Sequence, residues 1–175
     1  MTPTVIHAFS LRKGIVALAP MPGAGGDFAA DMAHFHGWQP SIVLTMVSVG
    51  EMAEAGHSDL GVAFSRIGAK WFHFPVRDFA VPDKSIERAW PEISKACHRV
   101  LDGGGKVLIH CHGGCGRSGM AALRLMIEAG EAPDAALTRL RGVRPCAVET
   151  DAQQAWARLG LGGVFRHQKG GSATP

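Results

Sequence analysis

The residues with the clearest capacity for chemistry form one continuous segment, in which a cysteine is followed six positions later by an arginine, with three glycines between them: residues 110–118, HCHGGCGRS. Glycines let the backbone curl so that successive N–H groups point inward and form a nest for an anion at the start of a helix. We expect this cradle to bind a phosphate or sulfate ion through His112, Gly113, Gly114, Cys115, Gly116 and Arg117.

Each polar residue of the segment has a distinct use at such a site. Cys111 follows directly after a predicted buried strand, so that the N–H groups and the helix dipole stabilise its thiolate as a nucleophile near neutral pH. The planar guanidinium of Arg117 can hold two phosphate oxygens at once, which a lysine does less well. Ser118 can donate a hydrogen bond to Cys111 and improve sulfur as a leaving group. These residues predict attack on phosphorus through a phosphocysteine.

A general acid is expected on a second loop. Residues 76–82 follow a predicted strand and carry Asp78, which is the candidate to protonate a leaving oxygen and then to activate water. Asp83 is the rival carboxylate. Its position after Pro82 favours capping of the next helix, so we assign the acid to Asp78.

The elements that position these residues alternate between strands and helices. Such alternation predicts a single-domain, three-layer α/β sandwich with a largely parallel central sheet, whose site lies at the carboxyl ends of the strands. The predicted strands are Ile15–Ala19, Ser41–Val47, Trp71–Pro75 and Lys106–His110. The predicted helices are Asp27–His36, Gly50–Ala55, one from Ser58, Asp83–Leu101, Ser118–Ala129, Asp134–Arg141 and Thr150–Leu159.

Length and composition limit the classes of protein. With 175 residues, 46% of them hydrophobic, the chain suits one domain over residues 1–161, followed by a polar tail at 162–175 that we expect to be partly disordered, above all at 169–175. An excess of 18 Lys+Arg over 15 Asp+Glu is too small to indicate a nucleic-acid partner. The longest uncharged stretch of the hydrophobic middle, residues 37–50, is too short for a membrane span. We expect a cytoplasmic protein.

The segment at 110–118 resembles the HCx5RS signature of the protein tyrosine phosphatase superfamily. Further similarity lies in Ala17–Gly23, Ile42–Val47, Phe74–Asp78 and Thr150–Leu159, whose order resembles the kinase-associated branch of the dual-specificity phosphatases. The resemblance covers about Ile15 to Leu159. It implies the protein tyrosine phosphatase fold, phosphorylated proteins or peptides as substrates, Asp78 on a mobile loop, and no metal or other cofactor.

One segment departs from that family pattern. The family often positions water with Gln-Thr-x-x-Gln, whereas this chain has Glu149-Thr150-Asp151-Ala152-Gln153. A carboxylate at the first position would repel a phosphoenzyme if it faced the site. The resemblance therefore favours Gln153 over Glu149 as the residue that acts on water.

The sequence gives indications of the substrate class and leaves alternatives for the reaction. The chain contains no tyrosine to line a deep phosphotyrosine pocket, and no lysine lies between Cys111 and Arg117 to favour inositol phosphates. We therefore expect a shallow site for phosphotyrosine and phosphoserine or phosphothreonine, with Arg139, Arg141 and Arg144 on a solvated helix face. The alternatives are rhodanese-like or arsenate-reductase-like oxyanion chemistry, and a phosphate-binding module without activity.

The four cysteines do not suggest a disulfide framework. Cys97 falls on the apolar face of a predicted helix and is expected in the core. Cys115 either captures an oxidised Cys111 as a disulfide or points into the core under the loop, and the second reading is slightly favoured. Cys146 is another candidate to capture Cys111.

Overall fold

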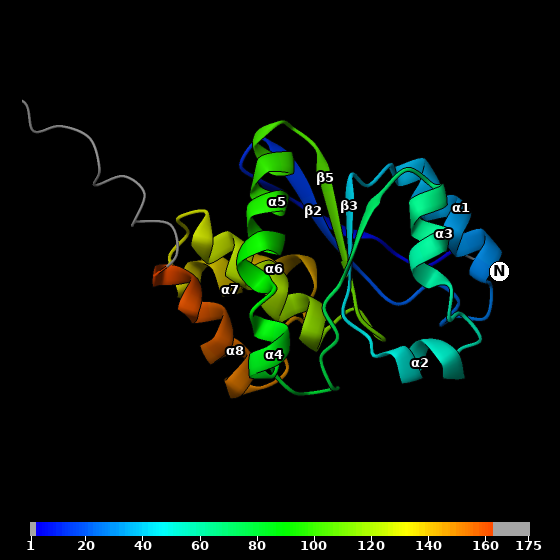
Figure 1. The fold of residues 1–175 in the computed structure, drawn as a ribbon. Helices are drawn as coiled ribbons and strands as arrows, with labels where there is room; N and C mark the ends of the chain where they lie inside the picture. The colour runs from blue at the N-terminus through cyan, green and yellow to red at the C-terminus, as the bar shows by residue number, and fades with distance from the viewer. Residues whose placement is uncertain (1–2, 163–175) are drawn as a thin grey trace, which may run out of the picture.

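A five-stranded sheet forms the centre of the computed structural model, which describes residues 3–162 (Figure 1). The strand order is β1-β2-β5-β3-β4, in which β1 pairs with β2 in antiparallel fashion and all other pairs are parallel. The strands are β1 (His7–Leu11), β2 (Gly14–Ala19), β3 (Ile42–Thr45), β4 (Lys70–His73) and β5 (Lys106–His110). The predicted, largely parallel α/β architecture is confirmed.

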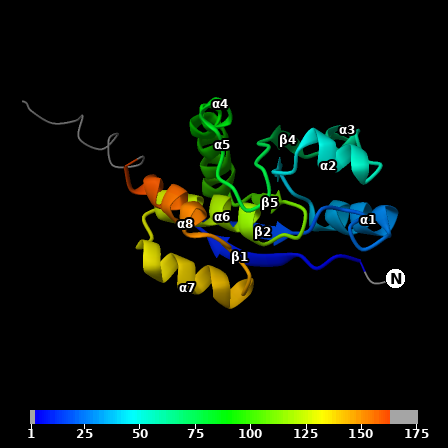
Figure 2. The same ribbon diagram turned by 90° about the horizontal axis from the view of Figure 1, so that it is seen from below.

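Helices cover both faces of the sheet (Figures 1 and 2). One face carries α1 (Phe28–Trp38), α2 (Val49–Glu54) and α3 (Leu60–Arg66). The other carries α4 (Lys84–Glu87), α5 (Trp90–Asp102), α6 (Gly116–Glu128), α7 (Pro133–Val143) and α8 (Asp151–Arg158), followed by a 3-10 turn at Leu159–Gly162. No helix within residues 3–162 is long and apolar enough to cross a bilayer.

The two layers of helices explain why the central strands lack an alternating polar pattern. All four residues of β3 are buried, and in β5 Val107 and Ile109 pack into the core beneath α5 and α6 while Leu108 packs into the core beneath α1 and α3. Successive side chains of a strand point to opposite faces, so a strand covered on both sides is apolar at most of its positions. The buried β5 therefore delivers Cys111 to the carboxyl edge of the sheet.

Two elements differ from the sequence-based expectations. Strand β1 was not predicted, although its alternating burial fits a strand with one solvated face. The single helix predicted at residues 83–101 is wrong: it is divided into α4 and α5, with Pro91 in the first turn of α5. Proline lacks an N–H and starts a helix more readily than it continues one. The predicted tail lies, beyond Gly162, outside the described residues.

A buried glutamate ties the helix that follows the cradle to its neighbour. Glu128 near the end of α6 accepts hydrogen bonds from Trp90 (2.8 Å) and from the hydroxyl of Ser94, both on α5, and pairs with Arg124 at 3.2 Å. Burial opposes its charge, but the donors of His98, Ser94 and Trp90 and the charge of Arg124 lower the pKa of Glu128 below its ordinary value. This network fixes α6 against α5.

Candidate active site

The loop between β5 and α6 curls tightly at the carboxyl edge of the sheet. Gly114 adopts a positive φ of 69°, and a Cβ at this position would meet the backbone carbon of Ala19 at 2.5 Å. Both the conformation and the space therefore require glycine. Helix α6 begins at Gly116, two residues before the predicted start, so the last turn of the loop already presents helical N–H groups to the cradle.

Cys111 lies at the base of this loop and is only 3% exposed. Its Sγ is 3.4 Å from the hydroxyl oxygen of Ser118. When the sulfur is a thiolate it carries no proton, so Ser118 must be the donor. The structure brings together the predicted nucleophile and the serine that the sequence pairs with it.

His110 orders the loop from the core. Its Nδ1 is 3.3 Å from the carbonyl oxygen of Cys111, and its Nε2 is 2.7 Å from the hydroxyl of Thr45, which accepts from the indole of Trp71 at 2.8 Å. Complete burial lowers the pKa of His110 to about 4. The neutral ring therefore carries its proton on Nδ1, donates to the carbonyl and accepts from Thr45. His110 therefore orders the loop through these contacts.

The guanidinium of Arg117 is buried, and most of its polar edge is occupied. Two nitrogens make paired bonds of 2.9 Å with the carboxylate of Glu51, one of them also donates to the carbonyl of Val76 at 3.0 Å, and Asp78 lies 3.5 Å away. Burial alone would lower the pKa of Arg117, but the bond to Glu51 and the neighbouring Cys111 raise it. Arg117 Nε has no partner among the described residues. That free donor is available to a bound oxyanion.

Glu51 is a site residue that sequence reasoning missed. It closes a capping box with Ser48 at the start of α2, which accounts for its backbone position, and its carboxylate orients Arg117, 66 residues further along the chain. Burial opposes its charge, while the bonds from Arg117 and Ser48 lower the pKa of Glu51. The Ser48-x-x-Glu51 pattern could have identified the cap, but nothing in it points to Arg117.

The two candidate acids occupy different environments. Asp78 lies in the turn after β4 with its side chain 58% exposed, 3.5 Å from Arg117. Asp83 caps α4 by accepting from the backbone N–H groups of Ser85 (2.9 Å) and Ile86 (3.0 Å), and its bonds to Ser85 and Ile86 lower its pKa. The structure therefore places Asp78 near the cradle and gives Asp83 a capping role.

Gln153 lies close to the cradle, but its amide is occupied by the backbone. Its Oε1 accepts from the N–H groups of Glu149 (2.9 Å) and Thr150 (3.3 Å), and its Nε2 donates to the carbonyl of Ala80 at 3.2 Å. Gln153 is completely buried. These bonds join the Asp78 loop to the start of α8. The assignment of Gln153 to water therefore stays a prediction, and its observed contacts are structural.

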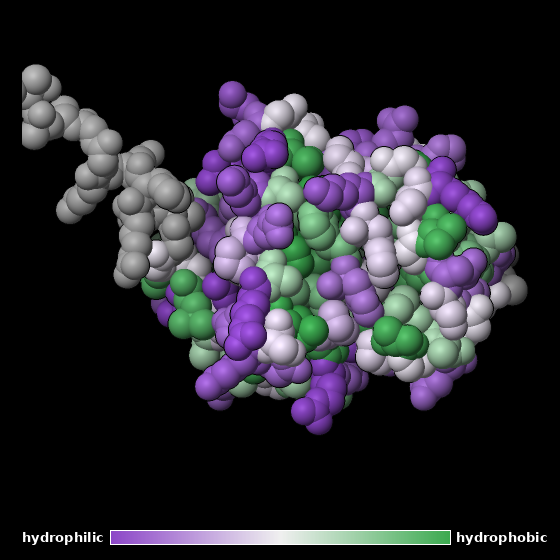
Figure 3. All heavy atoms as spheres, viewed as in Figure 1, coloured by the Kyte–Doolittle hydropathy of each residue, from purple (hydrophilic) through white to green (hydrophobic). Residues whose placement is uncertain are grey.

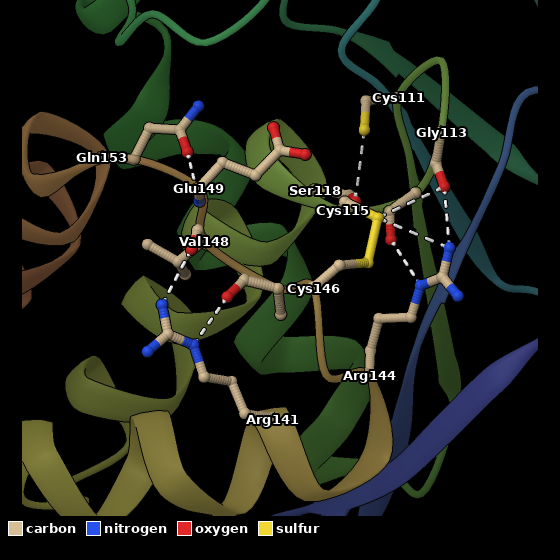
Figure 4. The surroundings of a disulfide bond; sticks show 12 residues. Cys111, Gly113, Cys115, Ser118, Arg141, Arg144, Cys146, Val148, Glu149 and Gln153 are labelled. Atoms are coloured by element: carbon tan, nitrogen blue, oxygen red, sulfur yellow. Dashed lines mark hydrogen bonds between the residues drawn. A yellow bond between two sulfur atoms is a disulfide. The ribbon is translucent and has the colours of Figure 1, made fainter.

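Of the three arginines expected on a solvated helix face, Arg139 and Arg141 on α7 are exposed, whereas Arg144, the residue that follows α7, is half-buried against the cradle loop, which corrects the expectation for Arg144. Arg144 donates to the carbonyls of Gly113 (2.9 Å) and Gly114 (3.1 Å) from outside the cradle (Figure 4). Arg141 binds the carbonyls of Ala147 and Val148 at 3.0 and 2.8 Å. Arg139 pairs with Glu131 and also binds a carbonyl of β1. Because Arg144 holds the loop carbonyls outward, their peptide N–H groups are left for an anion.

The structure also overturns the expected state of two cysteines. Cys115 forms a disulfide with Cys146, which lies 31 positions further along the chain, and their Cα atoms are 5.2 Å apart (Figure 4). Cys115 therefore neither points into the core nor remains free to capture Cys111. Cys111 and Cys97 are free and buried, and burial raises the pKa of Cys97 to about 12, as a core thiol requires. Disulfides persist mainly in oxidising compartments, so the state of this pair depends on where the protein works.

Loss of this disulfide is expected to lower the free energy of unfolding. Closing a loop across 31 residues contributes about 3–4 kcal/mol by constraining the unfolded chain. Cys146→Ser should therefore melt well below the wild type in the absence of reductant. Dithiothreitol provides the control: it should lower the melting temperature of the wild type toward that of the variant and leave the variant unchanged. A wild type insensitive to reductant would show that the bond does not form in solution.

The other surface features described for residues 3–162 lie apart from the cradle. Within residues 3–162 there is no group of three or more His, Cys, Asp and Glu side chains that could hold a metal ion. A groove of about 190 Å³ between β4 and α5 is lined by Lys70, Phe72, Glu92, Lys95, Ala96 and Arg99. Figure 3 shows hydrophilic and hydrophobic residues intermixed on the face that contains α5. The groove shares no residue with the cradle.

A buried cysteine in a curled glycine-rich loop, with an arginine held beside it and an aspartate on a facing loop, is the arrangement typical of cysteine-dependent phosphatases of the protein tyrosine phosphatase fold. The family model described as "Polymorphic toxin system, DSP-PTPase phosphatase" matches residues 29–131, more than half of the chain. The chain belongs to this family of dual-specificity-type phosphatases.

Individual relatives agree with this assignment. Cyclin-dependent kinase inhibitor 3 of Mus musculus is 34% identical over 103 residues, or 58% of this chain and 47% of that protein, and the Rattus norvegicus protein is 32% identical over 104 residues. The chain thus spans about half the length of these curated relatives.

Solved structures agree on the fold. Kinase associated phosphatase, with a serine substituted for its catalytic cysteine, has a TM-score of 0.81 at 23% identity, covering 95% of this chain and 99% of that one. Tk-PTP in its active form has a TM-score of 0.68 at 28% identity, covering 87% and 95%.

Proposed function

We propose that this protein hydrolyses phosphomonoesters on tyrosine and on serine or threonine of proteins through a phosphocysteine at Cys111. The observation that carries the proposal is the state of Arg117: Glu51 holds one edge of its guanidinium, while its Nε donor stays unpartnered and buried near Cys111. An unsatisfied buried donor is costly unless a ligand uses it. A phosphate oxygen in the cradle would satisfy it.

The proposed first step is displacement at phosphorus. The Cys111 thiolate attacks, an S–P bond forms, and the P–O bond to the side chain breaks. Asp78 gives its proton to the departing oxygen, so that an alcohol or phenol leaves. Arg117 and the loop N–H groups hold the phosphoryl oxygens through the charge-spread transition state. Water then cleaves the S–P bond, and the hydrogen bond from Ser118 stabilises the returning thiolate.

Hydrolysis of p-nitrophenyl phosphate in the presence of a chelator tests the proposal. Turnover that persists without metal and depends on Cys111 supports a phosphatase. Transfer of sulfur from thiosulfate to cyanide, or thiol-dependent reduction of arsenate, without phosphate release would instead support the rhodanese-like or arsenate-reductase-like reading. Phosphate binding without any turnover would indicate a binding module.

Asp78→Asn is expected to slow the release of poor leaving groups most. For a phosphothreonine peptide we expect a loss of about 100-fold or more, because an alkoxide needs a proton to leave, and a much smaller loss for p-nitrophenyl phosphate. Asp83→Asn is the matched control. A leaving-group-dependent loss in that variant, absent from Asp78→Asn, would reverse the assignment.

The substrate range is a further expectation. With no tyrosine in the chain and no lysine among residues 112–116, we expect hydrolysis of both phosphotyrosine and phosphothreonine peptides and little preference for phosphoinositides. A panel of matched peptides and inositol phosphates, compared by kcat/KM, measures this. A strong preference for an inositol phosphate would contradict the shallow, protein-directed site.

A further inference from the structure

The connection between α7 and α8 brings a second carboxylate to the rim of the cradle. Glu149 precedes the N-cap of α8, and a Cβ built on Gly116 would collide with its Oε2, so the carboxylate lies against the first residue of α6. In Figure 4 it extends from the connection toward the start of α6, which carries Ser118. The N-terminal end of a helix favours a negative charge.

Contacts on both sides of Glu149 fix its backbone. Its own N–H donates to Gln153 at 2.9 Å, and the N–H of Val148 lies 3.4 Å from the carbonyl of Cys115 in the cradle. Three residues upstream, Cys146 is bonded to Cys115. The segment therefore cannot move away from the cradle without breaking several contacts at once.

The backbone at this point is also strained. Val148, which is β-branched and buried, has a φ of 64°, in a region that such residues rarely adopt. Strained residues of this kind persist where surrounding contacts over-determine them, and they concentrate at functional sites. Here the conformation directs the next residue, Glu149, to the cradle.

Glu149 shares the space above the cradle with the proposed acid. Partial burial and the neighbouring charge of Asp78 raise the pKa of Glu149 above its ordinary value, while Arg117 acts in the opposite direction. Glu149 lies against Gly116 at the start of α6, and Asp78 lies 3.5 Å from Arg117 on the turn after β4, so the two carboxylates approach the same ion-binding loop from different parts of the chain. Sites in which two carboxyl groups interact in this way commonly divide acid and base roles between them.

We propose that Glu149 is a catalytic base for hydrolysis of the phosphocysteine, leaving Asp78 to protonate the leaving group in the first step. This rests on the proposed function and reverses the expectation that favoured Gln153, whose amide is occupied by backbone groups. The positive charge of Arg117 opposes the repulsion expected between this carboxylate and a phosphoenzyme. A glutamine at this position, as the family pattern has, could orient water but could not accept its proton. In the step proposed, water oxygen attacks phosphorus, its proton passes to Glu149, the S–P bond breaks, and the electron pair returns to Cys111 as thiolate. Inorganic phosphate leaves, and Glu149 releases the proton to solvent.

Pre-steady-state kinetics of the full chain with p-nitrophenyl phosphate test this role. Glu149→Gln should keep a rapid burst of p-nitrophenolate within about threefold of the wild-type rate, while its steady-state rate falls about 10- to 100-fold. Phosphoenzyme, measured by mass spectrometry after denaturing quench, should accumulate. Asp151→Asn, which neutralises an exposed carboxylate two residues further on, is the matched control and should behave as wild type.

Chemical rescue separates a base from a positioning residue. Glu149→Ala should lose the same steady-state rate, and added formate should restore part of it by supplying a carboxylate, without changing the burst. Unchanged steady-state turnover in Glu149→Gln would overturn the proposal. So would equal slowing of burst and steady state with no accumulation of phosphoenzyme. A wild type without any Cys111-dependent turnover would instead overturn the proposed function itself.

Discussion

Cys111→Ser is expected to abolish turnover, lowering kcat by about 10⁴-fold or more while phosphate binding largely remains. A serine hydroxyl is not ionised near neutral pH, so the nucleophile is lost. The cradle is retained because its N–H groups, the bonds of Arg144 to Gly113 and Gly114, and the Glu51–Arg117 pair do not depend on the sulfur.

Activity against p-nitrophenyl phosphate and calorimetric titration with inorganic phosphate measure the two halves of this prediction. Cys97→Ser is a poor control because Cys97 is fully buried in the core. Cys146→Ser is also unsuitable, because it breaks the disulfide to Cys115 of the cradle, so the wild type measured in parallel is the reference. Appreciable turnover in Cys111→Ser would remove Cys111 from the mechanism.

Arg117→Lys is expected to lower kcat/KM by about 10³-fold although the charge is kept. An ammonium group cannot make the paired bonds to Glu51 and at the same time present a second donor to phosphate. The loss should appear in kcat as well as in KM, because the charge-spread transition state needs the two-pronged contact most.

Arg139→Lys is the matched control, since Arg139 also makes a paired contact with a carboxylate, Glu131, but away from the cradle. That variant should retain wild-type kinetics. Thermal melts of both variants with and without phosphate show whether the fold persists. An Arg117→Lys enzyme within tenfold of the wild type would exclude Arg117 from transition-state binding.

Much of the fold and part of the candidate site can be predicted from short stretches of the sequence. The cradle occupies nine consecutive residues, so the relation of Cys111 to Ser118 follows from local geometry once β5 ends and α6 begins. The buried strands and most helices also follow from local apolar patterns and caps, such as Asp27, which accepts from the N–H of Ala30 at 3.0 Å at the start of α1. Local signals failed where a proline divided one predicted helix into α4 and α5.

Tertiary structure alone decided which distant residues complete the site. Glu51 reaches Arg117 across 66 positions, and Cys115 meets Cys146 across 31. The sequence predicts Arg144 as one of several surface cations, whereas in the structure it donates to the carbonyls of the cradle loop. The physical reason is that each contact depends on how the helices pack against the sheet. The local sequence pattern of α2 or α7 carries no information about which residue of the cradle it will contact at the carboxyl edge of the sheet. The position of Glu149 at the cradle is likewise decided by the tertiary structure, because it depends on how the α7–α8 connection packs against α6.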